Sequence, residues 1–126
     1  MSVDPIPTPS APPVAGPYSP AVRAGDWIVL AGQVGIDADG AMADGIEAQT
    51  RQILANIGAV LGDCGASWAD VAKTTIFLTD LGNFSTVNAL YSEAIGPNRP
   101  ARSTVGVAAL PAGAVVEIEC WVHRPA

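Results

Sequence analysis

A short apolar run in the first third of the chain predicts a buried strand. Trp27-Ile28-Val29-Leu30-Ala31 follows Gly25-Asp26, and Gly32 ends the run. A continuous apolar stretch of this length, bounded by turn residues, is typical of a strand buried on both faces. The next segment, residues 36–40, ends in an aspartate–glycine turn signal. Residues 27–43 are therefore predicted to form this strand and a following ribbon.

Two segments repeat their apolar residues at helical spacing. From Gly45 to Gly62 the repeat predicts an amphipathic helix, with Asp44 placed to cap its N-terminus. Its predicted buried face is Ile46, Ile53, Leu54, Ile57, Val60 and Leu61. A second helix is opened by residues 80–83 and ended by residues 96–100. Its predicted buried face is Phe84, Val87, Leu90, Tyr91 and Ile95.

Three further segments favour strands. Residues 71–79, between the two helices, are rich in β-branched and aromatic side chains, and residues 102–109 and 114–124 are separated by Leu110-Pro111-Ala112-Gly113. Alternation along the last strand puts Val116, Ile118, Cys120 and Val122 on one face, and Val115, Glu117, Glu119, Trp121 and His123 on the other. The first set is suited to packing under helices.

Together these elements predict an α+β fold of order βββαβαββ. Two helices cannot cover both faces of a six-stranded sheet, so both should lie on one face and leave the other bare. Hydrophobic residues make up 49% of the chain and charged residues only 14%. Because so few charges are available to cover a monomer's surface, we expect another subunit to cover the bare face.

Proline dominates the N-terminal segment. Seven of the eleven prolines fall in the first twenty residues, where fixed φ angles and missing N–H groups prevent helix and interior strand. Residues 1–14 are predicted to form an extended arm, with the character of a disordered tail up to about Val14. Tyr18, within Gly16-Pro17-Tyr18-Ser19-Pro20, is expected to be ordered.

Length and charge exclude several functional classes. The 126 residues are predicted to form a single domain. A net charge of −6 has the wrong sign for electrostatic binding of phosphate backbones, so nucleic acid is a poor candidate partner. Cys64, Cys120 and the single His123 lack the spacing of a structural zinc site, and no dinucleotide-binding or phosphate-binding glycine motif is present. The chain has neither a leader-like start nor an apolar stretch long enough for a membrane helix, so we expect a cytoplasmic protein.

Arg102 and Glu117 are the strongest candidates for chemistry. The planar fork of Arg102 can hold a substrate carboxylate through two parallel hydrogen bonds, although a structural pair with Glu117 or Glu119 explains it equally well. Glu117, a carboxylate on an otherwise apolar strand, can exchange protons with a bound water, or can form an interface salt bridge. Asn88 is either an exposed helix position or an amide that points into a site.

The spacing of these two residues restricts how they can meet. If residues 102–109 and 114–124 paired as a hairpin, Arg102 would face Trp121, and Glu117 would lie four residues away, roughly 13 Å. Either the two strands are not neighbours, or a site that uses both residues is completed across a subunit boundary.

Several motifs in order resemble one family. They are Gly16-Pro17-Tyr18-Ser19-Pro20-Ala21, Ala31-Gly32-Gln33-Val34-Gly35, Lys73 to Asp80, Pro100-Ala101-Arg102-Ser103-Thr104-Val105, Leu110-Pro111 and Val116-Glu117-Ile118-Glu119. From about Val14 to Arg124 the chain resembles the RidA/YjgF family of enamine/imine deaminases. This resemblance implies a chorismate-mutase-like subunit, a homotrimer with sites between subunits, and hydrolysis of 2-imino acids such as 2-iminopropanoate and 2-iminobutanoate without a metal or cofactor.

The resemblance also implies roles for single residues. Arg102 matches the arginine that clamps the substrate carboxylate, and Glu117 matches the glutamate that positions and helps to deprotonate the attacking water. Tyr18, Gly32 and Asn88 match positions that line the same cleft. Thr104 stands where many members have cysteine, so it is expected to bind substrate through its backbone and not as a thiol.

Two other functions remain open from the sequence. Parts of the family are assigned an endoribonuclease activity, which the charge of −6 and the lack of an aromatic and basic stripe argue against. A non-catalytic trimer that binds 2-oxo acids, or acts like a chaperone, would use the same cleft. Arg102 and Glu117 together favour catalysis, because carboxylate binding alone would need only the arginine.

Overall fold

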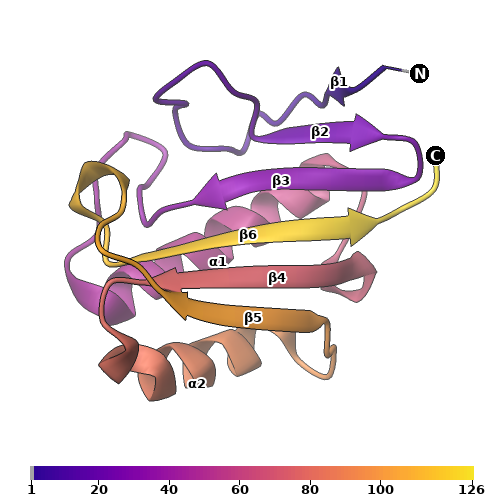
Figure 1. Ribbon diagram of the computed structural model, residues 1–126. Coiled ribbons are helices and arrows are strands. Elements are labelled where there is room, and N and C mark those ends of the chain that lie inside the picture. Colours follow the sequence, from indigo (N-terminus) through magenta and orange to yellow (C-terminus); the bar gives the residue numbers. More distant parts are fainter. Residues whose placement is uncertain (1) are drawn as a thin grey trace.

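Six strands form one mixed sheet in the order β1-β2-β3-β6-β4-β5 (Figure 1). The computed structural model describes residues 2–126. β4 and β5 run parallel, and the other neighbours are antiparallel. The strands are β1 (Asp4–Pro5), β2 (Ala21–Ala24), β3 (Trp27–Gln33), β4 (Val71–Leu78), β5 (Ala101–Gly106) and β6 (Val116–His123). The last strand of the chain therefore lies in the middle of the sheet.

Both helices lie on the same face of the sheet, α1 (Gly45–Asp63) behind its centre and α2 (Phe84–Ile95) beside β4 and β5 (Figure 1). The predicted inward set of β6 is fully buried beneath them: Val116, Ile118, Cys120 and Val122. On the predicted face of α1, Ile46 is partly buried and the other five residues are buried. The mixed six-stranded sheet with two helices is confirmed. Among residues 2–126 no helix has the length and apolarity to cross a membrane.

The opposite face of the sheet carries a solvent-exposed aromatic cluster. Trp27 packs edge-on against Trp121 and His123, at centroid distances of 6.5 and 5.1 Å. Trp27 is 39% exposed and Trp121 46% exposed. Such a group of large apolar side chains on a bare sheet face is typical of a surface that a partner covers.

The predicted ribbon after β3 is present but shorter than expected. Residues 36–42 make a single isolated bridge, Ile36 to Met42, and the other two strands of the N-terminal half come earlier, as β1 and β2. Asp37 explains the difference, because its carboxylate accepts hydrogen bonds from the N–H groups of Asp39 and Ala41, at 2.9 Å each. A side chain that satisfies two backbone donors makes a compact turn, and the pairing of the two segments is limited to the backbone bonds from Asp37 to Ala41 and from Ala43 to Gly35.

The interpretation of the N-terminal arm as a disordered tail is wrong for the described residues 2–14. Asp4 and Pro5 pair with β2 at the sheet edge, where a proline needs no donor on its outer side. Further along, Ser10 donates from its N–H and its hydroxyl to the two carboxylate oxygens of Asp63, at 2.8 and 2.9 Å. The arm is therefore fastened both to the sheet and to the end of α1.

Strands β5 and β6 are not hairpin neighbours, because β4 lies between them. Thr74 of β4 faces Arg102 of β5 on one side and Cys120 of β6 on the other. Of the two arrangements left open by the sequence, the structure adopts separated strands.

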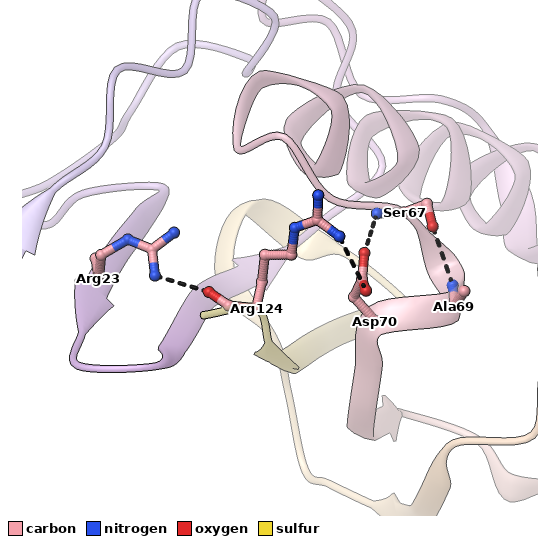
Figure 2. A network of polar contacts seen from close by, with 5 residues as sticks. All are labelled: Arg23, Ser67, Ala69, Asp70 and Arg124. Carbon is pink, nitrogen blue, oxygen red and sulfur yellow. Dashed lines mark hydrogen bonds and ion pairs between the residues drawn. The ribbon is translucent and has the colours of Figure 1, made fainter. Parts of the chain in front are cut away.

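A polar network fastens the end of the sheet away from Glu117 (Figure 2). Ser67 and Asp70 cap the short turn before β4 reciprocally, and Asp70 also pairs with Arg124 at 3.6 Å. The carbonyl of Arg124 accepts a 2.8 Å hydrogen bond from Arg23 of β2. The network joins β2, the end of β6 and the start of β4, and so fixes the chain end beside the sheet.

One buried hydrogen bond joins α2 to the sheet, and it predicts a stability change. The hydroxyls of Thr74 and Tyr91 lie 2.7 Å apart with both side chains buried. Tyr91→Phe should lower the free energy of unfolding by about 1 to 3 kcal/mol, because the Thr74 hydroxyl is left buried without a partner. Urea unfolding at equal protein concentration measures this change.

The double variant Tyr91→Phe with Thr74→Val is the control for this prediction. Valine has nearly the shape of threonine and removes the unpaired hydroxyl, so the double variant should recover most of the loss. Equal midpoints for the single and double variants would contradict the account.

Candidate functional site

Arg102 lies on the helix side of the edge strand β5 and is held by α2. Its Nη1 donates a 2.7 Å hydrogen bond to the side-chain oxygen of Asn88. Its guanidinium carbon lies 5.4 Å from the ring centre of Phe84 and 5.2 Å from that of Tyr91. Two rings and one amide fix the orientation of the guanidinium, and its other N–H groups stay available for a bidentate anion.

Phe84 corrects one prediction about α2. It was expected on the buried face, but it is 41% exposed because it extends past the sheet edge to the guanidinium of Arg102. Phe84, Asn88 and Tyr91 are separated by four and three residues, so they share one stripe of the helix. That spacing was the available signal that one stripe of α2 contacts Arg102.

Thr104 lies beside Arg102 on the same face of β5. It and Arg102 line a shallow depression together with Asn88 and Phe84, which is too tight to hold a water molecule. The Thr104 hydroxyl is buried and has no hydrogen-bond partner among residues 2–126. An unpaired buried hydroxyl is costly in a folded protein, so this atom requires a partner that residues 2–126 of one chain do not supply.

Glu117 lies on the other face of the sheet, next to Gly32. It pairs in register with Phe77 of β4, between the inward-facing Val116 and Ile118. A Cβ built on Gly32 would collide with Oε2 of Glu117 and lie 2.8 Å from its Cδ. Only glycine at position 32 therefore leaves room for this carboxylate.

The environment of Glu117 favours its protonated form. Burial raises the pKa of the Glu117 carboxyl above its ordinary value of 4.5, and the nearby negative charge of Glu119 raises it further. No side-chain hydrogen bond within residues 2–126 offsets this effect on Glu117. A carboxylate in such surroundings is a stronger proton acceptor than an exposed one, as general-base chemistry requires.

A cavity of about 290 Å³ opens above Glu117, and Tyr18 lines it. Its wall comes from three segments that meet at one end of the sheet: the N-terminal arm, the residues after β3, and the loop between β5 and β6 (Figure 1). Apart from Glu117 and Tyr18, the lining is apolar: Pro13, Val14, Ala15, Gly32, Val34, Ile36, Gly40, Pro111 and Ala112. Ala112 adopts a positive φ of 58°, a strained conformation that holds the turn at the cavity rim.

The six predicted site residues thus fall into two groups that do not meet within one chain. The arginine group consists of Arg102, Asn88 and Thr104, and the glutamate group consists of Glu117, Gly32 and Tyr18. The groups lie on opposite faces of the sheet, two strands and three residues apart, which is roughly 14 Å in the plane of the sheet. A salt bridge from Arg102 to Glu117 or Glu119 within the chain is excluded.

The arm and the loop residues of the glutamate cavity are the part that sequence analysis missed. Pro13, Val14 and Ala15 carry no chemical signature, and their place in the lining of the Glu117 cavity depends on how the arm folds back. Among residues 2–126 no cluster of three or more His, Cys, Asp or Glu side chains is placed to hold a metal ion. Cys120 is buried and burial raises its pKa to about 12, which makes it a core residue and not a nucleophile.

The contact between Gly32 and Glu117 predicts a change in acidity. Gly32→Ala should push the Glu117 carboxylate toward solvent, so its pKa should fall toward the ordinary value as the desolvation is lost. Carbon-detected NMR titration of the carboxyl group measures it. Gly62→Ala is the matched control, because nothing lies within 4 Å of its new Cβ. An unchanged pKa of Glu117 in Gly32→Ala would refute the contact.

Known proteins of one family are similar to this chain over nearly its whole length. The family model described as Endoribonuclease L-PSP matches residues 8–124. The 2-iminobutanoate/2-iminopropanoate deaminase of Salmonella typhimurium is 41% identical, covering 94% of this chain and 96% of its own, and the human protein of the same name is 40% identical, covering 90% and 85%. The structure of RidA from an Antarctic Psychrobacter species superposes with a TM-score of 0.90 at 39% identity, covering 94% of this chain and 97% of its own. The chain belongs to the RidA family, which is also described as the endoribonuclease L-PSP family.

Proposed function

We propose that this protein hydrolyses 2-imino acids, such as 2-iminopropanoate and 2-iminobutanoate, to 2-oxo acids and ammonia. The observation that carries the proposal is the division of the site into a carboxylate-binding group around Arg102 and a proton-accepting group around Glu117. The relatives named 2-iminobutanoate/2-iminopropanoate deaminase support the choice of substrate.

The proposed site forms between two copies of the chain. Each copy presents its arginine group at the edge strand β5 and its glutamate group on the bare face, so one copy's Arg102 can complete the cavity of its neighbour's Glu117. A contact between two different surfaces of identical chains gives a ring where the rotation between copies closes, and an open filament where it does not. We propose the homotrimeric ring of chorismate-mutase-like subunits that the family resemblance implies, with the exposed tryptophans covered inside it, and the cytoplasm as its location.

The reaction follows from the two groups. Arg102 holds the substrate carboxylate, and Glu117 accepts a proton from water as the water oxygen bonds to the imino carbon. The C=N double bond becomes single, and the nitrogen takes this proton from Glu117, which gives a carbinolamine. Glu117 then accepts the proton of the new hydroxyl group and passes it to the amino nitrogen. The C–N bond breaks, ammonia leaves, and the oxygen becomes the new carbonyl. No electrons are transferred to or from the substrate, so the hydrolysis needs positioned groups only.

A coupled assay tests this function. A threonine dehydratase releases 2-iminobutanoate, and the appearance of 2-oxobutanoate is followed with and without this protein. The wild type should accelerate it, and Arg102→Ala should lose about 2 to 4 kcal/mol of transition-state binding, roughly 30- to 900-fold in kcat/KM. Arg51→Ala, an exposed arginine of α1, is the control and should keep full activity. No acceleration by folded wild type would overturn the function, and RNA cleavage that Arg102→Ala abolishes would favour a ribonuclease.

Mixing two inactive variants tests the intersubunit site. Arg102→Ala and Glu117→Gln chains, co-expressed in equal amounts, should recover activity that neither variant has alone. In randomly mixed rings each site takes its arginine from one copy and its glutamate from the next, so about a quarter of the sites receive both intact residues. If both residues of a site came from one chain, the mixture would stay inactive.

A further inference from the structure

We infer that the proline-rich arm selects the substrate, with Pro13, Val14 and Ala15 forming the wall against which the side chain of the 2-imino acid lies. This inference rests on the proposed function and extends it to the choice among substrates. It assigns a role to a segment that the sequence alone presented as a tail.

The position of the arm relative to Glu117 carries the inference. The imino carbon must lie beside Glu117 to receive water, and the substrate carboxylate must point out of the cavity toward the neighbour's Arg102. The remaining substituent, the side chain, is then left facing the other lining of the cavity of about 290 Å³. That lining is apolar, and Pro13, Val14 and Ala15 form one continuous part of it. An apolar side chain is the chemical class that fits.

The arm is fixed before any substrate arrives. Ser10 is bonded twice to Asp63, Pro12 is buried, and Ile6 packs against the core and donates a 3.0 Å backbone hydrogen bond to Ala21. Two consecutive prolines, Pro12 and Pro13, further limit the freedom of the backbone. A wall that is already ordered discriminates by size, because little energy is lost in arranging it around the ligand.

The other two walls are fastened from the same helix. Buried Gln49 of α1 accepts from the N–H of Val115 at 2.9 Å and donates to the carbonyl of Ala43 at 3.1 Å. Asn56, also on α1, donates to the carbonyl of Ile36 at 2.8 Å. Because α1 holds all three walls, the cavity keeps its width, and the size of the side chains at 14 and 15 sets the space that is left.

Variants at these two positions test the inference. Val14→Ala enlarges the cavity and should shift the ratio of kcat/KM toward a longer substrate, 2-imino-4-methylpentanoate over 2-iminopropanoate, by about tenfold. Ala15→Leu fills the cavity and should shift the same ratio by a similar factor in the opposite direction. Val3→Ala is the matched control, since Val3 is exposed on the same arm and does not line the cavity.

A binding measurement separates this inference from the proposed function. Calorimetric titration of the same variants with pyruvate and 4-methyl-2-oxopentanoate reports the fit of the side chain without turnover, and Val14→Ala should improve the relative affinity for the longer acid. Suppose that the wild type hydrolyses imino acids, but that neither the kcat/KM ratio nor the affinity ratio changes in Val14→Ala and Ala15→Leu. The role of the arm is then refuted, and the proposed function still stands. If the wild type hydrolyses no imino acid, the proposed function fails, and the inference about its substrates fails with it.

The bond between Ser10 and Asp63 gives a second test. Asp63→Ala should release the arm, so a protease should cleave the segment that precedes Tyr18 faster than in the wild type. The ratio of kcat/KM between short and long substrates should also move closer to one. Asp44→Ala is the control, because Asp44 is an exposed carboxylate at the other end of α1 and its side chain makes no capping bond. Faster cleavage with an unchanged preference would overturn the inference.

Discussion

The burial of four alternate residues of β6 under the helices is the constraint on which the rest of the structure depends. Val116, Ile118, Cys120 and Val122 are completely buried in the centre of the sheet. Side chains alternate along a strand, so this burial forces Glu117 onto the bare face. A shift of one residue in the pairing would bury two carboxylates under α1 and expose the four apolar residues. The position of Glu117 is therefore a consequence of core packing.

The same alternation determines where Arg102 lies. It faces Thr74 across the parallel pair, and Thr74 points at Tyr91 of α2, so Arg102 is on the helix side. β5 is the edge strand, and the guanidinium of Arg102 contacts Phe84, Asn88 and Tyr91 there. An oriented, partly desolvated arginine at a sheet edge is suited to an anion that arrives from outside the subunit. The two groups of the site thus face two different surfaces, as a ring of identical copies requires.

Polar side chains on α1 hold the segments that form the walls of the cavity. Gln49 and Asn56 are buried among apolar neighbours, which is costly for an amide unless its hydrogen bonds are made. Both make them to backbone groups of the loops around Glu117, and Asp63 does the same for the arm. These hydrogen bonds offset the cost of burying the polar groups, and they also hold the loops in place. Gly32 completes the arrangement, since any side chain there would occupy the space of the carboxylate.

The sequence by itself determined the two helices, the burial of β6, the bare face of the sheet and the family, because these depend on local periodicity and on motifs contained within short segments. It also indicated Arg102 and Glu117, whose charges stand out in an apolar chain. Only the tertiary structure decided that β4 separates β5 from β6, that the arm forms an edge strand, and that Val14 lines the same cavity as Glu117. Each of these depends on contacts between residues distant in the chain, such as Ser10 with Asp63, and such contacts leave no periodic signal. The ribbon after β3 is shorter than its flanking residues predicted for a local reason, because the Asp37 side chain makes a compact turn that leaves a single bridge.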